Sequence, residues 1–301
     1  MPDLGYPDAR AVESAIKDAA KTAHAADSSR QIGDLIRQAY YDRFLCRVFS
    51  ETDVGEWVLK GGTGMLARIP TARRTLDADL YRAGYDKDQA LSDLRRLAAI
   101  DLGDHFRFIY REHRDILAGD AQPYTDGYRV PFDAYLGVKL VDTIKIDLSA
   151  GTGPTDSIEV EEPANRLPLP RLASYPYRLY PVANQVADKV CATIAEYDGR
   201  PSSREKDLVD LVVIAITQHV DGAALGRAIR NECAKRRLEV PNKLVIPSHW
   251  GPAYAKLAVN TPAEPHSIYW ARRILQAFID PVLAGEARGT WDSAARAWPA
   301  P

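Results

Sequence analysis

The sequence Trp57-Val58-Leu59-Lys60-Gly61-Gly62-Thr63 passes from an apolar run into a glycine pair, and Arg74-Thr75-Leu76-Asp77-Ala78-Asp79 follows it. The first segment predicts a short strand, a tight turn and a short helix over residues 65–69. The second predicts a strand over residues 75–81 that carries two carboxylates. A strand that enters a helix through a glycine turn has the geometry of a phosphate site. These segments predict an α/β core around a polar site.

Three aspartates are candidate metal ligands. Residues two apart in a strand point to the same side, so Asp77 and Asp79 are expected to project together, with α-carbons roughly 6 to 7 Å apart. Asp147 lies in Thr143-Ile144-Lys145-Ile146-Asp147-Leu148, where alternation places the acid on a polar face. Three clustered carboxylates repel one another, and one or two Mg²⁺ ions would compensate their charge. We therefore expect a magnesium site with positions open for phosphate oxygens.

The glycine turn complements these acids. Gly61 and Gly62 allow backbone N–H groups to approach a phosphate closely, and Thr63 adds a hydroxyl donor. Residues 60–74 contain four basic residues and no acid, a local charge of +4. This pattern is typical of a triphosphate or nucleic-acid site.

The pattern of the whole chain divides it into four parts. Helical periodicity over residues 9–24 and 29–49 predicts an N-terminal helical layer, residues 1–50. Alternating strand patterns and one helix make residues 51–162 an α/β core. Five prolines within residues 163–181 cannot continue a helix or a central strand, so this segment is expected to be an ordered connector. Helical patterns over 182–197, 203–218, 222–237 and 267–284 predict a helical C-terminal lobe, residues 182–301.

Composition excludes several classes of protein. The 301 residues include 39 Lys plus Arg and 41 Asp plus Glu, a formal charge of −2, which excludes a globally basic nucleic-acid coat. Three widely spaced cysteines predict neither a disulfide framework nor a structural zinc site, and they favour the cytoplasm. No segment resembles a signal peptide or a membrane span, so we expect no membrane contact.

The order of these motifs resembles that of the nucleotidyltransferase superfamily. A narrower resemblance is carried by four motifs: Leu59-Lys60-Gly61-Gly62-Thr63, Arg74-Thr75-Leu76-Asp77-Ala78-Asp79, Lys189 on a helix, and Arg204-Glu205-Lys206-Asp207-Leu208-Val209-Asp210. Together they resemble the AbiEii/AbiGii (MenT-like) family of toxin nucleotidyltransferases over residues 30–220. The resemblance implies an α+β, bilobed fold, with a small mixed-sheet domain of nucleotidyltransferase type, flanking helices and a helical C-terminal lobe.

The resemblance also implies roles for individual residues. It makes Asp77 and Asp79 metal ligands, and Asp147 is the third metal candidate. It makes Lys189, Asp207 and Asp210 essential residues of the second lobe. The candidate phosphate or nucleotide contacts are Gly61, Gly62, Thr63, Arg74, Arg204 and Lys206. Asp207 and Asp210 stand three residues apart on one helix face, where we expect them to orient Lys189.

Members of this family are the toxins of type IV toxin–antitoxin or abortive-infection systems. The resemblance implies Mg²⁺-dependent transfer of a nucleotide from an NTP to the 3′ acceptor end of tRNA, which blocks aminoacylation, and control by a cognate antitoxin. Two alternatives stay open. One is a nucleotidyltransferase for a small molecule or a protein, and the other is a non-catalytic pseudo-transferase that binds RNA or a partner.

Overall fold

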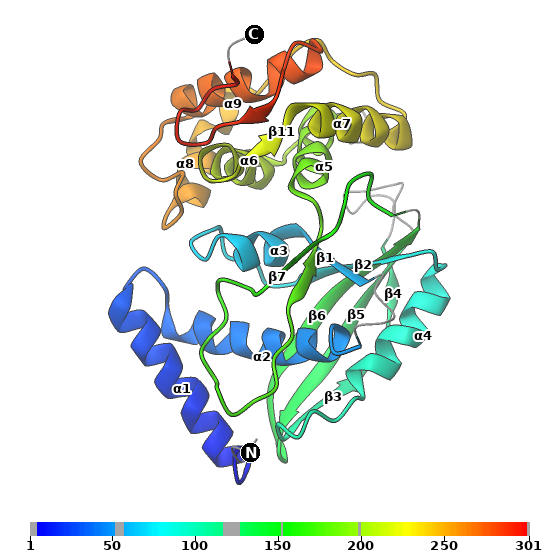
Figure 1. Ribbon diagram of the computed structural model, residues 1–301, viewed down its shortest axis with the longest axis vertical. Helices are drawn as coiled ribbons and strands as arrows, with labels where there is room; N and C mark the ends of the chain where they lie inside the picture. Colours follow the sequence, from blue (N-terminus) through cyan, green and yellow to red (C-terminus); the bar gives the residue numbers. More distant parts are fainter. Residues whose placement is uncertain (1–4, 52–56, 117–126, 152, 198–199, 300–301) are drawn as a thin grey trace.

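The chain folds into two lobes stacked along the long axis of the molecule (Figure 1). This computed structural model describes residues 5–51, 57–116, 127–151, 153–197 and 200–299. The N-terminal lobe contains a β-sheet with its helices, and the C-terminal lobe is mainly helical. The chain enters the C-terminal lobe at the start of α5 (Val182–Ile194).

The described residues of the N-terminal lobe form one mixed sheet of eight strands. The strands are β1 (Trp57–Lys60), β2 (Ala78–Ala83), β3 (Phe106–Tyr110), β4 (Arg114–Asp115), β5 (Gly127–Leu136), β6 (Lys139–Gly151), β7 (Glu159–Glu161) and β8 (Tyr177–Leu179). Their order is β3-β5-β6-β2-β1-β8-β7, and β4 pairs with β5. The pairs β2–β6 and β1–β8 are parallel and the others are antiparallel. This order places β2 in the middle of the sheet.

Helices cover one face of this sheet. They include α1 (Ala9–Ala26), α2 (Ile32–Val48) and α4 (Lys87–Ala98). Asp8 caps α1 by accepting a hydrogen bond from the Ala11 N–H, and Asp86 and Gln89 form a capping box at α4. Alternate residues of β5 and β6, such as Phe132 and Ile146, are buried in a core with these helices. The residues between them therefore face away from that core.

The C-terminal lobe packs its helices around a second core. It contains α5, α6 (Glu205–Thr217), α7 (Gly222–Arg236), α8 (Gly251–Ala258) and α9 (Ile268–Leu283). A 3₁₀ turn (Ser248–Trp250) precedes α8, and two short hairpins pair β9 (Glu196–Tyr197) with β10 (Arg200–Pro201) and β11 (Val220–Asp221) with β12 (Thr290–Trp291). Within the described ranges, none of the helices has the length and apolarity that crossing a membrane requires.

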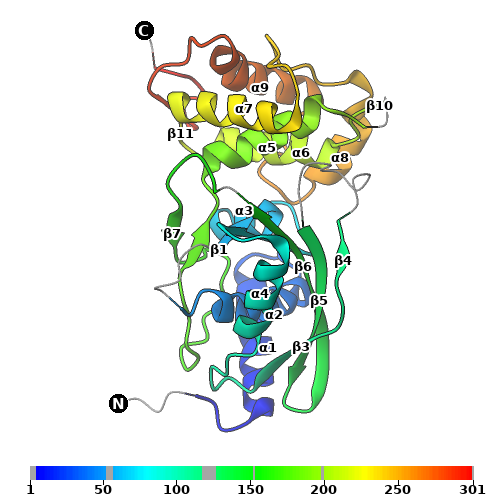
Figure 2. The same cartoon turned by 90° about the vertical axis from the view of Figure 1, so that its right-hand side faces the viewer.

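Helix α3 (Gly61–Arg68) belongs to both cores. Ala67 packs in the core of the N-terminal lobe, whereas Met65 and Leu66 pack in the core of the C-terminal lobe, together with Ile69 and Ala72 just after the helix. Figure 2 shows α3 directly beneath the C-terminal helices. The glycine turn at the start of α3 is thus held between the lobes.

The bilobed α+β fold expected from the sequence is confirmed. Three local features differ. The second site strand begins at Ala78 rather than Thr75, and the helix expected from Met65 begins at Gly61. The segment 163–181 contains β8, which pairs with β1 through Leu179. Pro176 and Pro181 lie outside the three residues of β8, so no proline interrupts this pairing. The four-part division of the chain stays a prediction.

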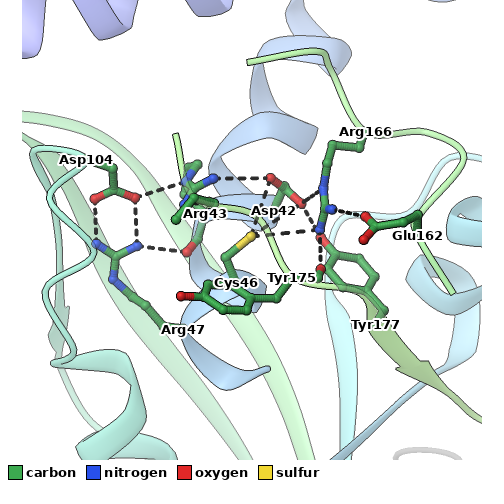
Figure 3. Close-up of polar contacts among 10 residues, drawn as sticks. Asp42, Arg43, Cys46, Arg47, Asp104, Glu162, Arg166, Tyr175 and Tyr177 are labelled. Atoms are coloured by element: carbon green, nitrogen blue, oxygen red, sulfur yellow. Dashed lines mark hydrogen bonds and ion pairs between the residues drawn. The ribbon is translucent and has the colours of Figure 1, made fainter. Parts of the chain in front are cut away.

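A buried cluster of charges joins α2 to the sheet and to the proline-rich segment (Figure 3). The carboxylate of Asp104 accepts hydrogen bonds from Arg43 at 2.9 Å and from Arg47 at 2.7 and 3.0 Å, and all three side chains are at most 1% exposed. Arg43 also donates to the Ala173 carbonyl at 2.8 Å. Because buried charges need their partners, this cluster fixes the position of α2 under the sheet.

We expect Asp104→Ala to destabilise the fold strongly, by about 3–5 kcal/mol, because it leaves Arg47 without a carboxylate partner and Arg43 with only the longer pair to Asp42, at 3.8 Å. Asp101→Ala is the control, since Asp101 is exposed and accepts one turn hydrogen bond, from Gly103. The Asp101→Ala variant should lose about 1 kcal/mol or less in its free energy of unfolding. Urea unfolding of both variants measures the difference. Equal losses would contradict a stabilising role for the cluster.

Candidate active site

The glycine turn brings the backbone against one of the predicted metal ligands. Gly61 has φ +59°, and a Cβ at this position would lie 1.8 Å from Oδ2 of Asp79. Gly62 allows Thr75 to pack closely, since a Cβ there would lie 2.9 Å from the Cβ of Thr75. Gln185 of α5 donates a hydrogen bond to the Gly61 carbonyl at 2.9 Å. Only glycine at position 61 leaves room for the Asp79 carboxylate.

Four charged residues lie in one row across neighbouring strands. The strand register pairs Lys60 of β1 with Asp79 of β2, Asp79 with Asp147 of β6, and Asp147 with Arg129 of β5. Directly paired residues share a face of the sheet at about 5 Å between strands. The Arg129 Nε atom lies 3.6 Å from Oδ1 of Asp147. In this row the two carboxylates are adjacent, and one cation flanks them on each side. The row lies on the face of the sheet that the core helices leave uncovered.

Asp77 reaches the same site from a bend rather than from the strand, which corrects the expectation that both acids stand on β2. Two threonine hydroxyls hold it there. Thr63 donates to the Asp77 carbonyl at 2.6 Å, and Thr75 donates to Oδ1 of Asp77 at 2.6 Å. The bend makes the shared orientation of the two acids depend on these hydrogen bonds rather than on strand periodicity.

The carboxyl group of Asp79 is buried beside two other carboxylates. Burial and the carboxylates of Asp77 and Asp147 raise its pKa to about 7, although Lys60 and Lys189 act in the opposite direction. No group in the described part of the chain donates a hydrogen bond to this carboxylate. The described residues contain no group of three His, Cys, Asp or Glu side chains already gathered as metal ligands. The structure thus brings the three acids together without closing them into a metal cage.

The opposite wall of the site comes from α5 and α6. The Lys189 ammonium lies 2.6 Å from Oδ2 of Asp210 and 3.1 Å from Oδ1 of Asp207. Burial alone would lower the pKa of Lys189, but these two carboxylates outweigh burial and hold its pKa above the usual value. Arg204 adds an ion pair to Asp207 at 4.0 Å. Lys189 is therefore charged, and its position is fixed.

Two cations missed by sequence reasoning as site residues connect the lobes. Arg73, in the loop after α3, pairs with Asp210 of α6 at 3.4 Å. Lys60 pairs with Asp188 of α5 at 3.3 Å and lies over the ring of Tyr180 at 4.4 Å. Both belong to the basic segment 60–74, but no periodicity in the sequence could show that their partners come from the other lobe.

These walls enclose a cleft of about 260 Å³ between the lobes. Ten of the twelve candidate residues line it, namely Gly61, Gly62, Asp77, Asp79, Asp147, Lys189, Arg204, Lys206, Asp207 and Asp210. Thr63 and Arg74 do not; both line a second cavity on the other side of Asp77, and Arg74 pairs with Asp34 at 2.9 Å. The roles assigned to all twelve stay predictions.

The family model described as nucleotidyl transferase AbiEii toxin, type IV toxin–antitoxin system, matches residues 43–295. The chain belongs to the AbiEii family. Its members are toxins with nucleotidyltransferase activity, and the match spans both lobes and therefore both walls of the cleft.

Two solved structures are remotely similar to this AbiEii protein. JHP933 from Helicobacter pylori is 17% identical with a TM-score of 0.43, covering 83% of this chain and 93% of its own. A proposed nucleotidyltransferase from H. pylori is 15% identical with a TM-score of 0.39, covering 86% of this chain and 89% of its own. None of the curated proteins compared with the chain matches it.

We expect Asp79→Asn to stabilise the metal-free protein in a pH-dependent way. The folded state holds the Asp79 proton up to about pH 7, whereas the ordinary aspartate pKa is 3.8, so the parent loses stability as the pH rises between these values. The free energy of unfolding of the variant should equal that of the parent near pH 4 and exceed it by about 1–3 kcal/mol at pH 8.

Thermal and urea unfolding in EDTA measure this difference. Asp18→Asn on the surface of α1, whose side chain is 67% exposed, is the control and should show no such trend. A difference that is constant with pH, or larger in acid, would contradict the raised pKa of Asp79.

Proposed function

We propose that this chain is a toxin that transfers a nucleoside monophosphate from an NTP to the 3′ acceptor end of tRNA, in an Mg²⁺-dependent reaction that blocks aminoacylation and translation. The main support is the neighbouring pair Asp79 and Asp147, with Asp77 beside them, facing the charged Lys189 across one cleft. The wall with the three aspartates suits a divalent cation. The wall with Lys189 suits the triphosphate to which such a cation binds.

The residues present fit a divalent metal. Asp77, Asp79 and Asp147 offer only carboxylate oxygens, which Mg²⁺ prefers, and they gather negative charge in one place; burial first, and the other two carboxylates second, raise the pKa of Asp79. When bound, the ion would offset this charge and polarise the phosphate that undergoes transfer.

The other residues bind and position the two substrates. The N–H groups of the turn at Gly61 and Gly62 lie at the start of α3, where an anion is favoured. Lys189 neutralises phosphate charge from the opposite wall, where Asp207 and Asp210 hold it. We assign Arg204 and Lys206, on the same wall, to the nucleotide. Thr63 contributes through its backbone, because its hydroxyl is engaged by Asp77.

The transfer is an in-line displacement at phosphorus. The 3′ oxygen of the acceptor forms a bond to the α-phosphorus while the bond from that phosphorus to the oxygen bridging to the β-phosphate breaks. Pyrophosphate leaves with the electron pair, and the proton of the hydroxyl is lost to water. The protein contributes position and charge compensation.

The proposed partners follow from the substrates and the family. They are an NTP, the acceptor end of tRNA, and a cognate antitoxin, which membership of a toxin–antitoxin family implies. We place the reaction in the cytoplasm, where tRNA and NTP are available. Cys46, Cys191 and Cys233 are free thiols, as a reducing compartment requires.

We expect Asp77→Ala to lower transfer by roughly 10²–10³-fold or more, the range seen when a charge-stabilising group is removed. The protein is incubated with Mg²⁺, total tRNA and each α-³²P-labelled NTP in turn, and the RNA is separated on denaturing gels. Asp18→Ala, on the exposed surface of α1, serves as the control and should retain the parental rate.

Thermal unfolding in EDTA should show that Asp77→Ala is folded, because it removes one of three like charges. Labelled tRNA with the parent and the control, but not with the variant, is the expected result. No label with any NTP would contradict a tRNA acceptor and turn attention to small-molecule or protein acceptors, or to a non-catalytic protein. Parental labelling by Asp77→Ala would contradict the site itself.

A further inference from the structure

The uncovered face of the sheet extends outward from the cleft. Arg129 of β5 and Asp147 of β6 are register partners, and both line the cleft. The next pair on this face is Pro131 with Lys145, about 7 Å farther along the strands. Figure 2 shows α2 and α4 on the other side of β5, where the core lies. An acceptor that leaves the cleft at Asp147 can therefore continue along the uncovered face.

Cations gather on this face, among the described residues of β3 to β6 and of the segment that joins β3 to β4. Arg114 of β4 is the register partner of Arg129, and Arg107 of β3 shares the face through its pairing with β5. Arg111 follows β3, and its Nε atom lies 3.6 Å from Oδ2 of Asp133. The cations of the face are Arg107, Arg111, Arg114, Arg129 and Lys145. The register of these strands places two acids with them, Asp133 and Asp147, so positive charge is in excess.

The cations of this face can accept a further anion. Lys145 and Arg107 are exposed, and within the described ranges neither forms an ion pair. Arg114 pairs with Glu112 at 2.8 Å, yet its side chain is 76% exposed, and that of Arg111 is 56% exposed. A guanidinium has five N–H donors, so one carboxylate partner leaves others for a phosphate. The face therefore suits a ligand with several negative charges.

The C-terminal lobe has a basic segment of its own at the end of α7, but its charges are used within the lobe. Arg236 is 6% exposed, and it donates to Glu232 at 2.6 Å. Lys235 approaches the same carboxylate at 4.0 Å. Among the described residues that line the cleft, none belongs to α7. Continuity with the cleft therefore favours the uncovered face of the sheet over α7 as the surface for the acceptor.

We infer that the uncovered face of β3 to β6 binds the phosphodiester backbone of the acceptor RNA, an inference that rests on the proposed function. The 3′-hydroxyl lies near Asp147, and the preceding nucleotides follow β5 and β6 away from the cleft. Their phosphates contact Arg129 and Arg114 first, and then Lys145 and Arg111. The whole chain has a formal charge of −2, so binding depends on this local cluster rather than on net charge. Contacts of this kind position an RNA without reading its sequence.

The test replaces two of these cations that lie outside the cleft, in the double variant Arg111→Gln/Lys145→Gln. The Kd for fluorescent tRNA is measured by anisotropy with Mg²⁺ and without NTP, and it should rise by about 10-fold at roughly 50 mM salt. The matched control is Arg230→Gln/Lys235→Gln, which removes the same charge from exposed positions of α7. It should keep the parental Kd, and thermal unfolding should show that both double variants are folded.

The salt dependence of the Kd decides whether phosphates are the groups that this face binds. Each phosphate contact contributes about 0.7–0.9 to the slope of log Kd against log salt concentration. The slope for Arg111→Gln/Lys145→Gln should therefore be smaller than the parental slope by about 1–2, whereas the control should keep it. A parental slope in this variant, or equal weakening in both double variants, would overturn the inference.

Transfer by the parent tests the proposed function separately. Labelled tRNA together with a parental Kd in Arg111→Gln/Lys145→Gln would keep the proposed function and overturn the inference. A parent that labels no RNA would overturn the proposed function, and with it the role of this face in holding an acceptor.

Discussion

Two carboxylates on adjacent strands, Asp79 and Asp147, sit side by side in the middle of the sheet, and the organisation of the cleft depends on how their charge is balanced. Within the sheet, Lys60 and Arg129 flank them at either end of the row. Burial first, and the carboxylates of Asp77 and Asp147 second, still raise the pKa of Asp79 to about 7. A divalent ion bound here would offset the charge of the carboxylates and would then hold the triphosphate.

The C-terminal lobe supplies the opposite wall of the cleft, with a fixed ammonium group. Lys189 is fixed by Asp207 and Asp210, and the second of these acids also receives Arg73 from the N-terminal lobe. Gln185 from α5 donates a hydrogen bond to the Gly61 carbonyl. The contacts that join the lobes are thus the contacts that surround the cleft, and α3, shared by both cores, keeps the phosphate turn at their junction.

The sequence predicts the parts of this site better than their arrangement. The period-two pattern around Asp147 and the helical spacing of Asp207 and Asp210 are local signals, and they place these residues on the correct elements. The bend at Asp77 depends on hydroxyls of Thr63 and Thr75, and the strand β8 depends on pairing with β1; neither has a local signal. Partners such as Asp188 for Lys60 arise only when the two lobes meet.

The most direct test of the account is a crystal structure of the protein with Mg²⁺ and a non-hydrolysable NTP. We predict an ion in contact with Asp77 and Asp79, and a triphosphate that lies between the turn at Gly61 and the ammonium of Lys189. A nucleotide bound elsewhere, or an ion that touches neither aspartate, would contradict the claim that the two walls of this cleft form one nucleotidyl-transfer site.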